Sequence, residues 1–175
     1  MSAVPTGTAV LCVLTGGVWT RCSVTPDSFT PSEVIRKAEL GDAEALAALS
    51  GQLGYPATAA LMRERLALIL PSADHAVFVA EVQGRVVAWT HVLKVLHLES
   101  GLCAEIAGLV VDEAHRSEGL GAELVRRAID WTRSQGLAVL QVRSRAERLR
   151  THQFYLRLGF AQTKVQHLFE LRVPD

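Results

Sequence analysis

Hydrophobic positions in the first half of the chain recur at the spacing of two short helices. A β-rich run at residues 34–38 precedes Gly41-Asp42, where Asp42 is predicted to cap a helix that the turn-rich segment 51–56 ends. Thr58 is predicted to cap a second helix, which Pro71 stops. The apolar stripe of this second helix consists of Met62, Leu66, Ile69 and Leu70, whereas its charged residues Arg63, Glu64 and Arg65 are expected largely elsewhere on its surface.

The middle of the chain has the composition and the turn signals of a β-sheet. Two β-rich runs, 77–82 and 85–90, flank the pair Gln83-Gly84, and this arrangement predicts a hairpin with a tight turn. The second run is expected to continue towards Leu98, to turn at 99–101 and to return over 103–112. The three runs therefore predict an antiparallel meander.

After Asp112 the hydrophobic period changes from that of a strand to that of a helix. An apolar stripe from 124 to 132 predicts a helix that ends near Gly136, and a strand is expected at 139–143. Because strand, helix and strand in this order form a right-handed crossover, the two strands are expected to be parallel neighbours in one sheet.

The last part of the chain predicts one more helix and a closing β element. The helix is expected over 147–158, with Gly159 at its end, and residues 160–173 are expected to form a closing hairpin or a paired strand. All elements together predict an α/β fold with mixed layers.

Composition narrows the class of protein. The 175 residues, 49% of them hydrophobic and 21% charged, suit one globular domain rather than a disordered or low-complexity chain. We expect residues 1–32, which are rich in Ser, Thr, Pro and Gly, to be a peripheral or flexible N-terminal extension and residues 33–175 to be a single domain. Eighteen basic and eighteen acidic residues cancel, so no nucleic-acid or anionic-membrane partner is expected.

The expected location is the cytoplasm. Three cysteines in no ligand or disulfide spacing suit a reducing compartment and predict no metal site. The apolar stretch 9–19 resembles a signal peptide, but residues 1–8 carry no Lys or Arg and Gly16-Gly17 interrupts it. No apolar run reaches the roughly 20 residues of a membrane span.

The most informative segment runs from Leu109 to Ala122, where a strand passes through a glycine-bearing loop into a helix. Glycines allow a ligand to approach the backbone, and the first N–H groups of a helix can donate to phosphate oxygens. Alone, Gly119-x-Gly121 is also compatible with a tight connection. A nucleotide P-loop would end in Gly-Lys-Ser/Thr, and the third glycine of the dinucleotide fingerprint is replaced by Leu124.

Two motifs together resemble a known family. Arg116-x-x-Gly119-x-Gly121 is similar to the pyrophosphate-binding motif of the GNAT superfamily of acyl-CoA-dependent N-acyltransferases, and residues 154–160, FYLRLGF, resemble the helix-to-strand segment of that family. The likeness extends in element order from about Ile35 to Leu171. It implies a mostly antiparallel mixed sheet, flanked by helices and splayed around the acyl-CoA site.

The resemblance also implies which residues bind acetyl-CoA, without a metal. Pantetheine would lie in the gap of the sheet, and backbone N–H groups of the loop would hold the pyrophosphate. The implied cofactor-binding residues are Leu109, Val110, Val111, Arg116, Ser117, Glu118, Gly119, Leu120, Gly121 and Ala122. Many relatives have an asparagine where this chain has Arg148, a departure that concerns one cofactor contact.

In the family's chemistry an amine attacks the thioester directly, through a tetrahedral intermediate. Glu105 matches a glutamate that often acts as general base, and Tyr155 matches the tyrosine that protonates the leaving thiolate. The alternative to a catalytic role is an exposed strand residue for Glu105 and packing in the core for Tyr155. Tyr55, Trp89 and His91 are the candidate substrate-binding residues. Tyr55 lies in a turn between the first two helices, the region that shapes acceptor specificity in the family. Trp89 and His91 share one face of the long central strand, where they would line the acceptor pocket; the alternative is a core tryptophan and a surface histidine.

The resulting expectation is a cytoplasmic N-acetyltransferase that moves the acetyl group of acetyl-CoA to a primary amine of a small molecule or of a protein or peptide. A homodimer is also expected, since residues 166–173 have the β character to pair between subunits. The alternatives are a catalytically inactive acyl-CoA-binding sensor or protein-interaction module, and a plain nucleotide-binding domain.

Overall fold

The computed structural model describes residues 11–15, 18–22 and 33–174, with backbone alone up to residue 33. The chain divides into two units, Met1–Glu33 and Val34–Asp175. In the first unit, β1 (Leu11–Thr15) pairs antiparallel with β2 (Val18–Cys22). The rest of the predicted extension over 1–32 lies outside the described residues.

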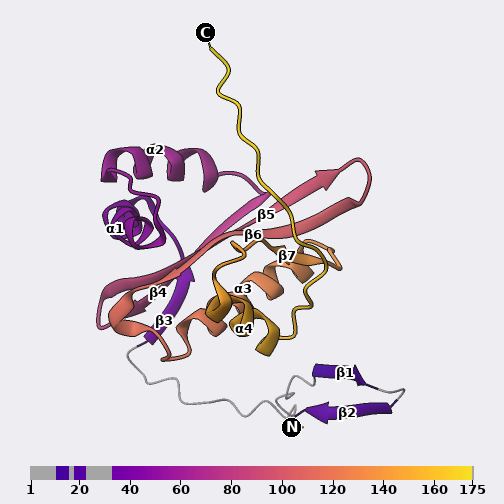
Figure 1. The fold of residues 1–175 in the computed structure, drawn as a ribbon. Coiled ribbons are helices and arrows are strands. Elements are labelled where there is room, and N and C mark those ends of the chain that lie inside the picture. Colours follow the sequence, from indigo (N-terminus) through magenta and orange to yellow (C-terminus); the bar gives the residue numbers. More distant parts are fainter. Residues whose placement is uncertain (1–10, 16–17, 23–32, 175) are drawn as a thin grey trace, which may run out of the picture. The chain divides into compact units, whose positions relative to one another are not determined.

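The second unit is built on a five-stranded sheet with the strand order β3-β4-β5-β6-β7 (Figure 1). β4 with β5, and β5 with β6, are antiparallel, whereas β6 and β7 are parallel. The predicted meander and the predicted parallel return strand are therefore confirmed. The strands are β3 (Glu33–Lys37), β4 (His75–Val82), β5 (Arg85–His97), β6 (Gly101–Val111) and β7 (Leu140–Val142).

The tight turn between β4 and β5 explains why this hairpin was predictable from sequence. Gln83 has φ of 51° and Gly84 has φ of 76°, so both central residues of the two-residue loop lie in the left-handed region. Two positive φ angles in succession are the geometry of the turn that matches the natural twist of a hairpin, and glycine adopts it without strain.

Helices cover both faces of the sheet (Figure 1). The short 3₁₀ turn η1 (Leu40–Asp42) leads into α1 (Ala43–Leu53), which packs with α2 (Ala59–Ile69) on one face, against Val77 and Val79 of β4. The opposite face carries α3 (Leu120–Ser134) and α4 (Leu149–Arg157). There Val125, Ala128 and Tyr155 pack against Ala76, Val92, Ala104 and Ile106. This arrangement confirms the predicted mixed fold with flanking helices.

One of the two predicted helix caps is confirmed and the other is wrong. Thr58 accepts a hydrogen bond from the backbone N–H of Leu61 at 3.1 Å. Asp42 makes no such bond to the helix that follows it; its carboxylate accepts two hydrogen bonds from Arg36, both at 2.8 Å, and one from the N–H of Glu39. A charged partner from β3 outcompetes the local helix amide, since charge-assisted bidentate pairs are the stronger interaction.

The predicted closing β element over 160–173 is also wrong. Residues 160–174 form no strand or helix, and their side chains are almost all exposed. In Figure 1 this segment extends away from the sheet towards the C-terminus. A β-rich pattern forms a strand only when a neighbouring strand satisfies its backbone groups, and within this unit the segment has no such neighbour.

Candidate active site

A bulge in β6 organises the centre of the sheet. His91 pairs with Gly108 and Val92 pairs with Ile106, so Ala107 is an extra residue in β6. The extra residue of a bulge shifts the alternation of side chains, so residues after it point to the opposite face from the one that regular alternation would give. Ala104 and Ile106 contact the core under α3, so Glu105 between them points to the face of α1 and α2, and so does Gly108, whose added Cβ would meet Trp89.

The sheet opens beside this bulge. β7 pairs with β6 only at Ala104, Glu105 and Ile106. From Ala107 to Val111, β6 has no described strand on that side, so alternate backbone groups there are available to a ligand. This opening is the splay that the sequence resemblance implied, and Leu109, Val110 and Val111 line its edge.

The glycine-bearing loop follows directly. Asp112 caps the 3₁₀ turn η2 (Glu113–His115) by accepting the N–H of Ala114 at 2.9 Å, and Gln52 of α1 binds both Asp112 and the N–H of Glu113. The hydrogen bond from the N–H of Ala114, and secondarily that from Gln52, holds the pKa of Asp112 below its usual value. The bonds with Gln52 connect the loop to α1.

The loop presents a row of unengaged backbone donors at the N-terminus of α3. Within the described part of the chain, the N–H groups of residues 116–121 donate to no backbone or side-chain acceptor, whereas the N–H of Ala122 donates to the carbonyl of Gly119 at 2.9 Å. Ser117 (φ of 72°) and Gly119 (φ of 91°) turn the chain so that it enters the helix. A helix N-terminus of this kind favours a bound anion.

The two loop glycines have different roles. A Cβ on Gly121 would lie 3.3 Å from the ring of Phe154 and 3.6 Å from Val111, so this glycine allows α3 to pack closely against α4 and β6. A Cβ on Gly119 would meet nothing within 4 Å, but its left-handed backbone favours glycine. The Arg116 side chain bonds the Val111 carbonyl at 3.3 Å and pairs with Glu113 at 3.2 Å.

Tyr155 lies on α4 with its ring inside the core under the sheet. It is 8% exposed and makes edge contacts with Phe154 and Phe160. Burial raises the pKa of its phenol to about 12, so the hydroxyl is protonated at neutral pH and can only donate its proton or accept a hydrogen bond.

Glu105 is buried in spite of its charge. It is 8% exposed, and its Oε1 accepts a hydrogen bond from Arg143 at 2.8 Å. Its Oε2 is buried and has no partner among the described residues. A buried carboxylate oxygen without a donor is costly, which indicates that a water molecule or a ligand group completes this site.

A cavity of about 360 Å³ lies between α1, α2 and the sheet and brings together Tyr55, Trp89 and His91. Arg65 also lines it. Its side chain is exposed, as the helical pattern predicted, but it lies three residues after Met62 and therefore on the same side of α2. Glu105 lies on the same face of the sheet but is not part of the wall.

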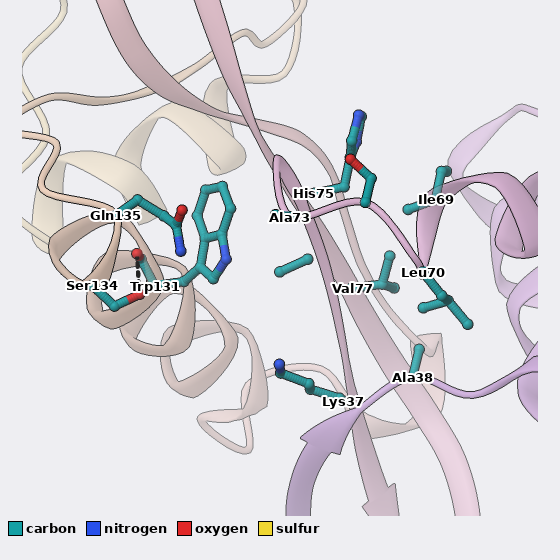
Figure 2. Close-up of a pocket in the computed structure, with 12 residues that line it drawn as sticks. Lys37, Ala38, Ile69, Leu70, Ala73, His75, Val77, Trp131, Ser134 and Gln135 are labelled. Atoms are coloured by element: carbon teal, nitrogen blue, oxygen red, sulfur yellow. Dashed lines mark hydrogen bonds between the residues drawn. The ribbon is translucent and has the colours of Figure 1, made fainter.

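His91 is paired with a second histidine. Its Nε2 lies 3.0 Å from Nδ1 of His75, and the two rings stack with their centroids 5.2 Å apart. Burial, and secondarily the neighbouring His75, lowers the pKa of His91 to about 4, so this ring is neutral at neutral pH. His75 in turn lines a second cavity, across which Trp131 of α3 and Gln135, directly after that helix, face Lys37 (Figure 2).

Two arginines that precede α4 contact the end of α1 and the segment after it. The Arg145 guanidinium lies 5.8 Å from the centre of the Tyr55 ring and donates to the Tyr55 hydroxyl at 3.3 Å. Arg148 donates to the carbonyl of Leu53 at 3.1 Å, at the C-terminus of α1. Arg148 thus has a structural partner at the position where many relatives carry asparagine. No local pattern in the sequence indicated these contacts, because the partners are separated by 90 residues or more.

The family follows from a comparison with known proteins. Residues 44–160 match the family model described as the acetyltransferase (GNAT) family. The chain belongs to the GNAT acetyltransferase family. This is the family that the two sequence motifs indicated.

Individual relatives agree with this assignment. An uncharacterized N-acetyltransferase from Methanocaldococcus jannaschii is 30% identical over 90 residues, which are 50% of this chain and 40% of that protein. The chain thus matches less than half the length of this curated relative.

Solved GNAT structures share the fold. Glucosamine-6-phosphate N-acetyltransferase from Arabidopsis thaliana is 23% identical with a TM-score of 0.69, covering 80% of this chain and 99% of that one. AAC(6')-Iy, solved with a bisubstrate analogue of CoA, is 19% identical with a TM-score of 0.71, covering 81% of this chain and 99% of that one.

Further features concern metals and membranes. Within the described ranges, no group of three or more His, Cys, Asp or Glu side chains is placed to hold a metal ion. A search of the same ranges finds no helix with the length and apolar character of a membrane span.

Proposed function

We propose that this GNAT protein transfers the acetyl group of acetyl-CoA to a primary amine of a small molecule or of a peptide. The observation that carries this proposal is the row of unengaged amides from Arg116 to Gly121, directly beside the open edge of β6. A pyrophosphate needs several convergent N–H donors, and pantetheine, which contains amides, needs an extended backbone edge. This loop and this edge offer both within one continuous segment.

Two groups are proposed to move protons. An alkyl amine has a pKa of about 10.4 in water, so it must lose a proton before it attacks the thioester. The partnerless Oε2 of Glu105 is suited to accept that proton through a water molecule, because it lies on the face of the sheet that carries the cavity. His91, which is neutral, can accept a hydrogen bond from the amine at the cavity wall.

Tyr155 is proposed to act at the leaving sulfur. Thiols have a pKa of about 8.5, so complete transfer from a phenol with a pKa of about 12 is uphill by about 5 kcal/mol. The phenol therefore first stabilises the developing thiolate by donating a hydrogen bond. The thiolate then takes its proton from solvent, or from the phenol if substrate binding lowers the pKa of the phenol. Tyr155→Phe is expected to lower kcat with little change in acetyl-CoA affinity.

Calorimetric titration with acetyl-CoA tests the donor site. Gly121→Trp is expected to lose acetyl-CoA binding. Its side chain would clash with Phe154 and Val111 and would displace the N-terminus of α3, which carries the donor amides. Gly41→Trp is the control, since a Cβ there meets nothing within 4 Å. Ser117→Asp is a second variant that adds a carboxylate beside the donor amides without a bulky group. No acetyl-CoA binding to the wild type, or equal binding to all variants, would refute the proposal.

A turnover assay on the same protein then distinguishes an enzyme from an inactive acyl-CoA-binding sensor. Release of CoA thiol with an amine panel, reduced in Tyr155→Phe and Glu105→Gln, is expected of the enzyme. Acetyl-CoA binding without thiol release from any amine would instead favour the inactive acyl-CoA-binding module.

We also propose a homodimer formed through the C-terminal segment. In residues 169–173 apolar and polar positions alternate, and Phe169, Leu171 and Val173 are 83–90% exposed. An amphipathic strand with a bare apolar side is stabilised by pairing with another sheet edge, and β7 is such an edge. Light scattering should report a dimer for the wild type and for Glu170→Gln, and a monomer for Leu171→Asp.

The activity is proposed to reside in residues 33–175, in the cytoplasm, with residues 1–32 as an extension outside the catalytic domain. Cys103 is a free, buried cysteine, as suits a reducing compartment. A chain that begins at residue 33 should bind acetyl-CoA as tightly as the full chain; a large loss of affinity would place the extension within the functional unit.

A further inference from the structure

The charges around the cavity between α1, α2 and the sheet bear on the amine that it accepts. Most of the wall is apolar, and the described residues that form it include no Asp or Glu. Among these described wall residues Arg65 is the only one with a charged side chain, and His91 is neutral. The volume of about 360 Å³ is near the lower end of the range of roughly 300–1,000 Å³ that small-molecule pockets occupy. A small molecule with a largely apolar body fits this wall.

The positive charge of Arg65 is not neutralised within the described residues. Arg65 has neither an ion pair nor a side-chain hydrogen bond there, whereas many other arginines, such as Arg36 and Arg143, are paired with carboxylates. A second guanidinium, that of Arg145, contacts the wall residue Tyr55. Glu105, on the same face of the sheet, is already paired with Arg143. The cavity therefore presents positive charge to an incoming ligand.

A second, independent observation is an unused donor in the wall. The indole Nε1 of Trp89 is buried and has no hydrogen-bond acceptor among the described residues. Trp can only donate at this atom, so the group that completes it must be an acceptor oxygen or nitrogen. A buried donor without a partner is unfavourable, and a bound ligand oxygen or a water molecule relieves it.

We propose that the acceptor of this site is a small apolar amine that carries an anionic oxygen group, a carboxylate or a phosphate, and not a polycation. This inference rests on the proposed acetyl transfer. The anionic group binds at Arg65, an oxygen of the substrate accepts the Trp89 N–H, and the apolar body lies between α1, α2 and β5. A polycation would meet the guanidinium of Arg65 and, beside Tyr55, that of Arg145, with no carboxylate among the described residues of the wall, which is repulsive and leaves its charges uncompensated.

Matched amines test the charge preference. The probes are 4-(aminomethyl)benzoate and benzylamine, which differ only in the carboxylate, together with O-phosphoethanolamine for phosphate and spermidine as a polycation. With saturating acetyl-CoA, kcat/KM is expected to be about tenfold or more higher for the carboxylate than for benzylamine, and lowest for spermidine. A higher rate with O-phosphoethanolamine than with the carboxylate would identify phosphate as the anionic group.

Variants of α2 assign the preference to its residue. Arg65→Gln is expected to lower the ratio of kcat/KM for the two benzyl amines about tenfold, and Arg65→Glu to invert it. Arg63→Gln is the control, because this arginine lies on the same helix outside the cavity wall. Spermidine used as well as the carboxylate, or an equal ratio in wild type and Arg65→Gln, would overturn the proposal.

A binding measurement separates this inference from the proposed function. Thermal stabilisation by 4-(aminomethyl)benzoate, absent with benzylamine and lost in Arg65→Gln, would support the anionic site even if no thiol were released from any amine. In that case acetyl transfer alone would be refuted. No stabilisation and no turnover by the anionic amines would overturn the inference, whatever the affinity for acetyl-CoA.

Discussion

The buried pair of His91 and His75 predicts that the folded protein loses stability in mild acid. The pKa of His91 is lowered from 6.5 to about 4 in the folded state, chiefly by burial. Between these pH values the unfolded chain binds a proton that the folded protein does not bind. Stability is therefore fully present above pH 6.5 and is lost as the pH falls towards 4.

The size of the effect follows from the difference in pKa. At 1.36 kcal/mol per pH unit, a change from 6.5 to about 4 corresponds to a loss of about 3 kcal/mol below pH 4. At pH 4.5 most of this loss, roughly 2 kcal/mol or more, is already expected. Domains of this size are stable by only about 5–15 kcal/mol, so the loss is large enough to measure.

Urea denaturation at pH 7.5, 6.5, 5.5 and 4.5 measures the effect directly. Other groups also titrate in this range, so the decisive quantity is the difference between the wild type and His91→Gln. The wild type should lose roughly 2 kcal/mol more than the variant between pH 7.5 and 4.5. His167→Gln is the matched control, because this histidine is exposed and lies outside the cavity wall.

Parallel stability curves for the wild type and His91→Gln would refute this reasoning. They would mean that the ring is protonated in the folded protein, and hence that the cavity admits enough water or counter-charge to solvate an imidazolium.

Three further changes have expected effects on the free energy of unfolding, each measured by urea denaturation. Gly108→Ala should cost about 1–3 kcal/mol, since the new Cβ would lie 2.8 Å from ring atoms of Trp89; an unchanged stability would show that the ring moves freely. Thr58→Ala should cost about 1 kcal/mol by removing the cap of α2, whereas Thr58→Ser should cost little. Arg36→Met should cost about 1–3 kcal/mol, because it leaves the buried Asp42 carboxylate without its charged donor, and a loss below this range would show that water replaces it.

Local signals explain which parts of the fold could be predicted. The β4–β5 hairpin follows from alternation around Gln83-Gly84, and the end of α4 follows from Gly159, whose φ is 89°. Asp42 shows the limit of such signals. Its sequence context is that of a helix cap, but Arg36 and Glu81 form an ion-pair cluster that only the folded sheet assembles.

Local signals also predicted part of the candidate site. Trp89 and His91 share one face of β5 because they are two residues apart, so alternation alone placed them together. The role of Arg65 was not predictable, since which sector of α2 faces the cavity depends on the packing of α1 and α2. The contacts of Arg145 and Arg148 depend likewise on two loops that meet only in the fold.

The bulge at Ala107 connects these observations. In a regular strand, residues three apart point to opposite faces, yet Glu105 and Gly108 both face α1 and α2. The extra residue thus lets one strand contribute a buried carboxylate and a cavity wall to the acceptor side. It also coincides with the point where β7 ceases to pair, which leaves residues 107–111 open to the donor. The single extra residue Ala107 therefore brings the proposed acceptor site and the proposed acetyl-CoA site together at one position of β6.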